Sequence, residues 1–368
     1  MDFIVKDRNV QPIAVIDLYA SAIWTERYSD TGDFTLIMPV NSEYLDYLAI
    51  DNYLTLPGSD RAMIIEAMEL VSEVSTGKKV VSYTGTSLES ILKRRIVWSQ
   101  TTITGDLIAI IRQLLNENLI FPEESQAGRN SRKISDFIFP EVTDSVMLAL
   151  VSAIGTIKCQ FTGDTLFDAI KDLCDPYNIG FKVCFNDAGQ FVFSLYYGTD
   201  RSSNQSERDP VVFSPEYDTL ISSRYVANFT DYKNVTLVLG EDAGANRKRA
   251  IVYSGSSEPR GLDRRELYTD ARDLQSEREN GTTMTDAEYT QVLQNRGYSK
   301  LNEHSISAAF DGEVETSIGP QFNRDYFLGD FVSAINEYGL GSIAQITEYV
   351  RSYDENGYSA YPTFVMVS

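Results

Sequence analysis

The sequence predicts an α+β protein in which two antiparallel β-rich blocks flank a middle segment of helices and a hairpin. Three observations indicate this class. Strand-like runs separated by turn residues fill the chain up to Trp98, apolar residues at helical spacing follow, and strand-like runs return in the last third. Two β-rich blocks around a mixed segment suggest a duplicated antiparallel β-barrel, although no sequence repeat accompanies them.

We divide the chain of 368 residues into three predicted domains. Residues 1–98 are expected to form a first β-barrel domain, and residues 99–200 a mixed α/β lateral domain. Residues 201–368 are expected to form a second β-barrel domain, with a charged and helical insertion at about 261–304. A chain of this length is long enough to bury more than one hydrophobic core.

The first block has the composition of two hairpins and a short helix. Its predicted strands are residues 22–28, 34–38, 61–74 and 78–83. Pro39 ends the second strand because proline cannot donate to a ladder, and Ser75-Thr76-Gly77 supplies the turn of the second hairpin. The pattern Thr86-Ser87-Leu88-Glu89 is typical of a capping box and predicts a helix through Leu92. We interpret this block as a small antiparallel barrel or sandwich.

The middle segment combines helical spacing with one hairpin. Apolar residues at helical spacing predict a helix over 107–115. Thr165 caps a second predicted helix, which ends at Pro176. Its buried face is expected to contain Leu166, Phe167, Ile170 and Leu173. A hairpin is predicted from the strands 181–185 and 191–195.

The last third returns to strands and is interrupted once. The strand-like runs are residues 219–229, 234–239, 250–253, 331–336, 342–353 and 359–366. Residues 261–281 are densely charged and carry few large apolar side chains, so we expect a connector or a solvated helix there. Thr285-Asp286-Ala287-Glu288 is a second capping box and predicts a helix to about Leu301. Asn356-Gly357 predicts a hairpin with a type I′ turn, because both residues tolerate positive φ.

Charge and cysteine content exclude several classes of protein. The formal net charge is −21, from 32 Lys and Arg against 53 Asp and Glu. Proteins that grip nucleic acid need clustered cations that displace counterions from phosphates, so this class is excluded. The three cysteines are too few, and odd in number, for a disulfide framework, and they favour a reducing compartment.

The sequence predicts no targeting or membrane-spanning segment. The first eight residues carry charges of both signs and lack the apolar run of a signal peptide. The longest apolar stretch, residues 146–154, is too short to cross a bilayer. We therefore expect a protein that is made in a cytoplasm and stays soluble until it is assembled or released.

The side chains that commonly carry chemistry do not form a recognisable pattern. His304, the single histidine, lies at a predicted helix end, where the helix dipole stabilises a cation. Cys159, Cys174 and Cys184 lack the close spacing of zinc ligands, both among themselves and with His304, and no calcium-loop pattern is present. We therefore predict no catalytic, cofactor-binding or metal-binding residue.

Two pattern matches are set aside because their surroundings do not fit. Residues 339–344 match a loose dinucleotide fingerprint, but they lie between predicted strands without the helix that would receive a pyrophosphate. Ser90-Ile91-Leu92-Lys93 matches Ser-x-x-Lys without its companion elements. The many acidic residues do not single out a glycosidase pair, and a solvated acidic surface is the favoured interpretation.

Several stretches, taken in their order along the chain, carry a family resemblance. In the first block they are Trp24-Thr25-Glu26-Arg27-Tyr28, Gly32-Asp33-Phe34, Leu36-Ile37-Met38-Pro39, Met63-Ile64-Ile65-Glu66 and residues 85–96. Farther along they are residues 197–205, residues 213–218, Gly261-Leu262-Asp263-Arg264-Arg265-Glu266 and Leu328-Gly329-Asp330-Phe331-Val332. With these motifs the chain resembles the ReqiPepy-type siphovirus tail protein family, which belongs to the tail-hub class of phage tail-tip proteins.

The resemblance implies an assembly protein without catalytic residues. The assembly residues that it implies are Trp24, Arg27, Tyr28, Arg94, Arg95, Asp200, Arg201, Gln205, Asp263, Arg264, Arg265, Glu266, Gly329 and Asp330. It also implies a baseplate-hub subunit with two related β-barrel domains. Three such subunits would form a homotrimeric ring with pseudo-sixfold symmetry.

The resemblance further implies the partners and the location of the protein. The ring would join the tail tube or distal tail protein to the tip and fibre proteins. The tape measure protein, and later DNA in transit, would pass through its channel. The protein would be made in the bacterial host cytoplasm and reside in the virion. Because no C-terminal lysin extension follows the last strand, wall-degrading or receptor-binding domains are expected in another polypeptide.

Two features of the residues agree with this role. An acidic balance suits a channel through which DNA slides without binding, and Arg201 and Arg264-Arg265 with Glu266 are expected to form bidentate pairs between neighbouring segments. Two alternatives stay open at this point. One is a tail-associated cell-wall hydrolase, and the other is a receptor-binding adhesin.

Overall fold

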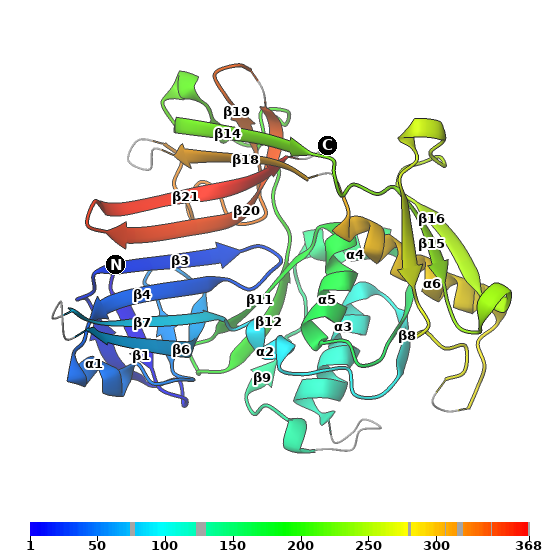
Figure 1. Ribbon diagram of the computed structural model, residues 1–368, viewed down its shortest axis with the longest axis horizontal. Coiled ribbons are helices and arrows are strands. Elements are labelled where there is room, and N and C mark those ends of the chain that lie inside the picture. Colours follow the sequence, from blue (N-terminus) through cyan, green and yellow to red (C-terminus); the bar gives the residue numbers. More distant parts are fainter. Residues whose placement is uncertain are drawn as a thin grey trace. The chain divides into compact units, whose positions relative to one another are not determined.

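A computed structural model of the chain describes residues 1–73, 78–122, 130–278, 281–305, 307–314, 319–339 and 341–366. The chain forms two compact units (Figure 1). Unit 1 contains Met1–Ser90, Gly180–Val226 and Ala308–Ser368, and unit 2 contains Ile91–Ile179 and Ala227–Ser307. Each unit is assembled from separate stretches of chain, and the three consecutive domains expected from the sequence stay a prediction.

Unit 1 is built on one long sheet. Its strands are β1 (Phe3–Lys6), β2 (Pro12–Ile16), β3 (Ser21–Arg27), β4 (Asp33–Pro39), β5 (Tyr53–Thr55), β6 (Ala62–Glu73), β7 (Lys78–Ser87), β13 (Val212–Phe213), β14 (Leu220–Asn228), β18 (Ser307–Val314), β19 (Phe331–Ile335), β20 (Gly341–Asp354) and β21 (Gly357–Met366). The strand order is β14-β18-β21-β20-β3-β4-β7-β6-β5-β1-β2, while β19 pairs with β20 and β13 pairs with β19. A short helix, α1 (Ser42–Tyr47), precedes β5.

The pairing of β3 with β20 joins the two ends of the chain in this sheet. The two strands are antiparallel, with Trp24 opposite Arg351, and the blue and red strands lie side by side in Figure 1. The two predicted β-rich blocks therefore share one sheet, and the described strands close no barrel. The α+β class is confirmed as a mostly β fold with few helices, whereas its description as two barrels is not.

Two hydrophobic cores stabilise unit 1. Alternate residues of β4 point inward, as expected for a strand with one buried face. The first core contains Phe3, Val5, Ile16, Trp24, Phe34, Leu36, Met38, Leu54, Met63, Ile65, Val81 and Tyr83. The second contains Tyr28, Phe213, Leu220, Tyr326, Leu328, Val332, Ile346, Tyr349 and Phe364.

The helix predicted from the first capping box begins later than expected. Thr86 lies inside β7, where its backbone faces Asp33 on one side and Ile64 on the other. Pairing on both sides holds this residue in an extended conformation, so tertiary contacts override the local helix signal. The observed helix, α2, is a single turn over Ser90–Lys93. The turn Ser75-Thr76-Gly77 of the preceding hairpin lies outside the described residues.

Several predictions with strong local signals are confirmed. Helices α3 (Leu107–Leu115) and α5 (Leu166–Cys174) begin where expected, because the side chains of Asp106 and Thr165 accept hydrogen bonds from backbone N–H groups of the first turns. The predicted hairpin is β11 (Gly180–Phe185) and β12 (Phe191–Tyr196), which belongs to unit 1.

Unit 2 combines helices with two small sheets. Besides α3 and α5 it contains β8 (Thr101–Gly105), β9 (Phe137–Ile138), α4 (Ser145–Ile154), β10 (Ile157–Phe161), β15 (Val235–Leu239), β16 (Arg249–Tyr253), β17 (Glu266–Asp270) and α6 (Asp286–Glu303). Strands β8 and β10 pair antiparallel, and β16-β15-β17 form a three-stranded sheet. Residues from both sides of the contact between this sheet and α6 form a third core, including Val238, Val252, Tyr289 and Leu293.

Strand β17 was not expected, because it lies within the charged stretch 261–281. Its residues Glu266–Asp270 pair in parallel with β15. Only Thr269 of β17 is buried, and its hydroxyl lies 2.8 Å from that of Thr236. A strand with one polar buried residue and charged ends gives no apolar alternation, which explains why the pattern predicted a connector or solvated helix.

The final hairpin is confirmed, but its turn differs from the prediction. Asp354 pairs with Gly357, so Glu355 and Asn356 are the two turn residues. Gly357 has a φ of 107°, while Asn356 is not among the described non-glycine residues with positive φ. The type I′ assignment is therefore wrong. The Asp354 carboxylate accepts a hydrogen bond from the Asn356 N–H at 2.7 Å, which stabilises the alternative turn.

The second capping box is confirmed at the start of α6. The Thr285 hydroxyl accepts from the Glu288 N–H, and the Glu288 carboxylate accepts from the Thr285 N–H at 2.9 Å. The helix ends at Glu303, with His304 at its C-terminal cap. Among the described helices, none is both long and apolar enough to cross a membrane.

We expect the start of α6 to lose stability in acid. Hydrogen bonds from Lys158 and from Thr285 lower the pKa of Glu288 from 4.5 to about 2. Because the folded state holds this pKa below its unfolded value, the contribution is present above about pH 4.5 and disappears as the pH falls toward 2. Glu288→Gln should therefore lower the melting temperature near neutral pH, and the difference from the unsubstituted protein should vanish toward pH 2.

The exposed Glu207 provides the matched control for this measurement. Glu207→Gln should leave the melting temperature within experimental error across the same pH range. A Glu288→Gln difference that stayed constant with pH would contradict the assignment.

Candidate functional site

The motif residues of unit 1 gather around the buried ring of Tyr28, which directly follows β3. The ring centroids of Tyr28 and Tyr196 lie 4.9 Å apart in an edge-to-face arrangement. The Tyr28 N–H donates to the carbonyl of Thr347 at 2.9 Å, and the Tyr196 hydroxyl donates to the carbonyl of Tyr28 at 2.6 Å. Burial raises the pKa of the Tyr28 hydroxyl, which therefore stays protonated.

Gly329 packs against the same ring. Its φ is +90°, a conformation that favours glycine, and a Cβ added at this position would overlap the Tyr28 ring. Gly198 in turn lies against the backbone of Gly329, without room for a side chain. The motif glycine is thus required by the close approach of the loop to the ring.

Asp330 connects this loop to the segment after β12. One carboxylate oxygen accepts the Thr199 N–H at 2.7 Å. The other accepts the Phe327 N–H at 3.0 Å and the Nε of Arg201 at 2.6 Å. Asp330 is buried, so these three donors stabilise a charge that has left water. Of the expected assembly residues, Tyr28, Arg201, Gly329 and Asp330 are brought together here.

Trp24 and Arg27 hold β3 against β20. Arg27 forms ion pairs with Asp33 and with Glu348, which stands directly opposite it, and donates to the Thr31 carbonyl at 2.8 Å. The indole N–H of Trp24 donates to Glu26 at 3.2 Å, and Glu26 forms a buried ion pair with Arg351.

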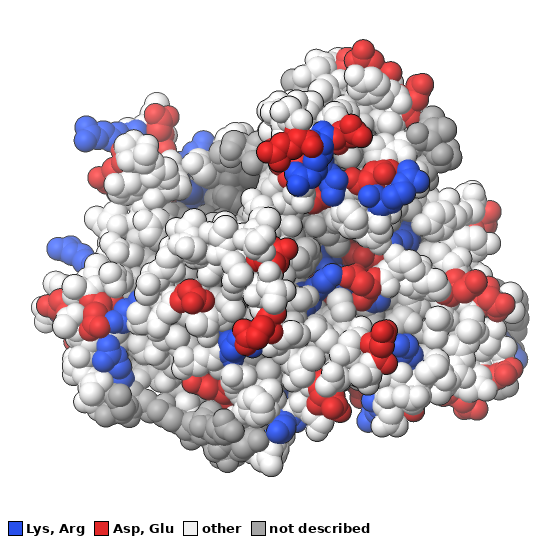
Figure 2. All heavy atoms as spheres, turned by 180° about the vertical axis from the view of Figure 1, so that it is seen from behind, with Lys and Arg blue, Asp and Glu red and all other residues white. Residues whose placement is uncertain are grey.

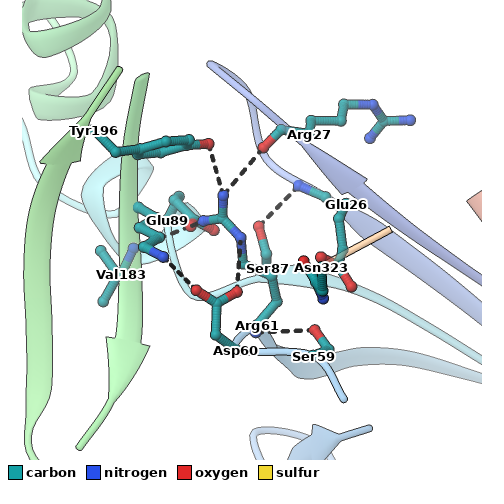
Figure 3. A network of polar contacts seen from close by, with 12 residues as sticks. Glu26, Arg27, Ser59, Asp60, Arg61, Ser87, Glu89, Val183, Tyr196 and Asn323 are labelled. Carbon is teal, nitrogen blue, oxygen red and sulfur yellow. Dashed lines mark hydrogen bonds and ion pairs between the residues drawn. The ribbon is translucent and has the colours of Figure 1, made fainter. Parts of the chain in front are cut away.

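Among the ion pairs of unit 1 between described residues, that of Arg61 with Glu89 is the most deeply buried (Figure 3). Their side chains are 4% and 1% exposed. Arg61 also donates to the Tyr196 hydroxyl at 2.8 Å, and the Glu89 oxygen that faces Arg61 also accepts the Val183 N–H at 3.0 Å. The pair thereby connects β6, the segment after β7 and the β11–β12 hairpin.

Electrostatics agree with this geometry. Burial opposes a charge on Arg61, but Tyr196 and Glu89 raise its pKa well above the ordinary value. Burial alone would raise the pKa of Asp60, yet the neighbouring Lys182 and Arg61 lower it. Arg61 and Asp60 therefore stay ionised over the physiological range, and the arrangement is suited to holding segments together.

Arg61 and Tyr196 are not predicted as site residues from the sequence, and Glu89 is predicted only as a capping-box residue. Arg61 is 28 residues from Glu89 and 135 residues from Tyr196, so no local spacing connects them. One signal was present. Arg61 directly precedes the fully buried run 62–65, and a charge next to such a run requires a partner.

Asp200 and Gln205 order the loop that follows β12. The Asp200 carboxylate accepts the Ser202 N–H at 2.8 Å. Gln205 donates to the carbonyls of Ser202 and Arg208, and its side-chain oxygen accepts the Arg208 N–H at 2.9 Å. Both residues therefore have contacts that shape this loop.

Arg94 and Arg95 follow α2. The Arg95 guanidinium donates to the carbonyls of Arg132 and Arg94, each at 3.1 Å. Burial and the neighbouring Arg94 lower the pKa of Arg95. These contacts are with backbone carbonyls rather than with carboxylates.

The last motif, residues 263–266, lies at the start of β17. The Asp263 carbonyl accepts from the Asn234 side chain at 2.7 Å, and Arg264 pairs with Glu266 and with Glu258. Arg265 instead donates to the carbonyl of Phe229 at 2.6 Å. Arg264, but not Arg265, thus pairs with Glu266, and this pair lies within one segment rather than between neighbouring segments.

The three cysteines and the single histidine form no common site. Cys159 and Cys174 are buried, and burial raises the pKa of the Cys159 thiol to about 12. Cys184 lies in β11, and His304 caps α6. Within the described part of the chain no group of three metal-ligating side chains occurs. Residues 341–344 begin β20 without a following helix, and position 340 of the dinucleotide pattern is outside the described residues.

Removing the cation of the buried pair should destabilise the protein strongly. Arg61→Met leaves Glu89 buried without its counter-charge, and such changes cost about 3–5 kcal/mol. Arg8→Met is the control, because it removes an exposed pair with Asp51 and should cost less than about 1 kcal/mol. Urea unfolding measures both values. Adding Glu89→Leu to Arg61→Met should recover part of the loss, and equal losses in the two single variants would contradict the buried pair.

A methyl group at Gly329 should be poorly tolerated. Gly329→Ala combines strain at positive φ with overlap on the Tyr28 ring, and overpacking of this kind costs about 1–3 kcal/mol. Gly58→Ala is the control, since Gly58 has a φ of +82° with nothing within 4 Å of an added Cβ. The melting temperature should fall clearly more for Gly329→Ala. Similar shifts would show that backbone strain alone acts at Gly329.

Solved tail proteins share the fold. The tail protein from Neisseria meningitidis MC58 is 10% identical, with a TM-score of 0.56 and coverage of 99% of this chain and 96% of that chain. The 43 kDa tail protein of prophage MuSo2 from Shewanella oneidensis is 12% identical, with a TM-score of 0.57 and coverage of 100% and 98%. Prophage tail protein gp18 from Listeria monocytogenes EGD-e is 13% identical, with a TM-score of 0.53 and coverage of 99% and 94%.

The family is identified by its sequence. No curated protein sequence matches the chain. The family described as Siphovirus ReqiPepy6 Gp37-like protein matches residues 3–364, which confirms the resemblance carried by the motifs. This family and the solved structures are structural tail proteins rather than enzymes. The chain therefore belongs to the Siphovirus ReqiPepy6 Gp37-like family of tail proteins.

Proposed function

We propose that the protein is a structural hub subunit of a siphovirus tail tip. Three copies form a ring that joins the tail tube or distal tail protein to the tip and fibre proteins. The observation that carries this proposal is the family match over residues 3–364. It is supported by the likeness in fold to tail proteins over nearly their whole length.

The edges of the unit 1 sheet support a ring. Strand β14 is the last strand at one end of the sheet. Toward the other end, β5 pairs only with Ala62–Ile64 of β6, so residues 66–73 of β6 pair with β7 alone among the described strands. An unpaired strand edge presents N–H and C=O groups that pair readily with another chain. Two such edges on one subunit are suited to a head-to-tail contact, which closes into a ring when the rotation between neighbouring copies divides a full turn.

The exposed side chains of the two edges complement one another. On β6, Met68 and Leu70 are 48% and 46% exposed, and Glu66 and Glu69 are exposed beside them. On β14, Ile221 is 59% exposed and Tyr225 is 41% exposed, and Arg224 is the only charged residue of the strand. Strand pairing between copies would bury these apolar side chains and place opposite charges together.

We further propose that the ring encloses a channel for the tape measure protein and for DNA in transit. In the ring, residues 1–98 and 201–368 act as two related β-barrel domains, with residues 99–200 as the lateral domain. An inner wall that carries an appreciable share of the acid excess would let DNA slide without binding. On the face drawn in Figure 2, acidic side chains lie in small groups among basic ones, so this face does not suit such a wall.

Native mass spectrometry and negative-stain imaging of the purified protein test the proposal. A trimer that appears as a ring with an open centre is the expected result.

The family consists of structural tail proteins, which disfavours a tail-associated hydrolase. Location at the tail tip is tested by labelling virions with an antibody against the chain, and label confined to the head would contradict it.

Charged substitution at the β6 edge should prevent ring formation. Leu70→Lys places a cation where the proposed contact buries an apolar side chain, so the trimer fraction should fall at least tenfold. Val15→Lys is the control, because Val15 is similarly exposed on β2 but lies outside the proposed edges. Sedimentation velocity measures both variants. A trimer unaffected by Leu70→Lys, or equally affected by Val15→Lys, would contradict the edge contact.

A further inference from the structure

The three-stranded sheet of unit 2 has one covered and one open face. On the covered face, Val238 and Val252 pack with residues of α6. On the open face, the strand register aligns Ile251 of β16, Leu237 of β15 and Tyr268 of β17 in one row. Their side chains are 54%, 39% and 56% exposed. These three large side chains are neighbours across the strands and form an apolar row that is partly exposed to solvent.

Charged residues surround this row. At one end of the sheet, Arg249 and Asp270 stand on either side of Leu239. Asp270 pairs with Arg247 at 2.8 Å and also with Arg272. At the other end, Glu266 pairs with Arg264.

The charged side chains at the two ends of the sheet also differ in their ion-pair partners. Arg264 bonds Glu258 at 2.6 Å as well as Glu266. Arg249 is exposed and makes no ion pair with a described residue. A cation therefore stands free at one corner of the open face, and the exposed Glu266 stands at the diagonally opposite corner.

We propose that this open face, defined by Leu237, Ile251, Tyr268, Arg249 and Glu266, docks a second copy of the chain. The two copies meet face to face around a two-fold axis at Leu237. The two apolar rows then cross at Leu237, and Arg249 of each copy lies against Glu266 of the second copy. The strands of the two sheets cross steeply, which is one of the two common ways in which sheets pack.

Charge identifies a second copy as the occupant. The chain carries a net charge of −21, so two copies repel one another over most of their surfaces. Around the open face, the carboxylates of Asp270, Glu258 and Glu266 meet four arginines, so these groups carry no excess of negative charge; the arginines are Arg247, Arg249, Arg264 and Arg272. A surface without excess negative charge, and with opposite charges at opposite corners, complements itself, as a two-fold contact requires.

This contact goes beyond the proposed function. It uses unit 2, whereas the proposed ring uses the sheet edges of unit 1. It therefore joins two subunits, or two rings, through a separate surface. Because repeated contacts add up, we expect assembled rings to associate more tightly through this face than free subunits do.

A self-cross-link tests the two-fold contact. Only a residue near the axis meets its own counterpart, so Leu237→Cys in the full chain should form a disulfide-linked dimer under mild oxidation. Leu262→Cys is the control. Leu262 is fully exposed on the turn before β17, and random collision would cross-link it faster than position 237. A non-reducing gel reports both variants, in a Cys184→Ser background. Equal or faster dimer formation at position 262 would overturn the proposal.

Charge exchange tests the pairing of the corners. Arg249→Glu and Glu266→Arg should each weaken self-association at least tenfold in sedimentation velocity, and the double variant should restore it. Single variants without effect, or a double variant that adds the two losses, would overturn the proposal. Leu70→Lys should leave the cross-link at position 237 intact, so a failure of the ring and a failure of this contact are distinguishable.

Discussion

The register of β3 against β20 is the constraint on which unit 1 depends. It places Arg27 opposite Glu348 and brings Glu26 to Arg351. Because successive side chains of a strand face opposite sides, a slip of one residue would separate both ion pairs and turn Trp24 out of the core. Strands on the β3 side supply the first core, and strands on the β20 side supply most of the second. Both cores therefore require the same pairing.

Elements with a local signal could be predicted from the sequence. The caps at Thr165 and Thr285 specify where α5 and α6 begin, because a side-chain oxygen and the N–H groups that it caps are only a few residues apart. Long-range pairing could not be predicted. It converted Thr86 from a helix start into a strand residue, and it made residues 266–270 a strand through a parallel neighbour. Nothing in the nearby sequence distinguishes these outcomes.

The residues of the candidate site likewise divide into those that could be predicted from the sequence and those that could not. Gly329 and Asp330 were expected from the resemblance, but their roles became clear only when the loop was seen against Tyr28 and Arg201. Arg61 and Glu89 were not expected, although their pair is more deeply buried than that of Arg201 with Asp330. A buried charge is tolerated only when its partner arrives from elsewhere in the fold, and an isolated sequence does not name that partner.

The same pairing has a consequence for biosynthesis. Arg27 and Glu348 are 321 residues apart, so β3 emerges from the ribosome long before the strand that covers its edge. Contacts over such distances form late, since the loop between them must first be closed. The segments of unit 2 are translated before β20, and they can order while the sheet of unit 1 is still incomplete. Chains that stop early keep an uncovered β3 edge, and only fully translated chains present a finished sheet to their neighbours.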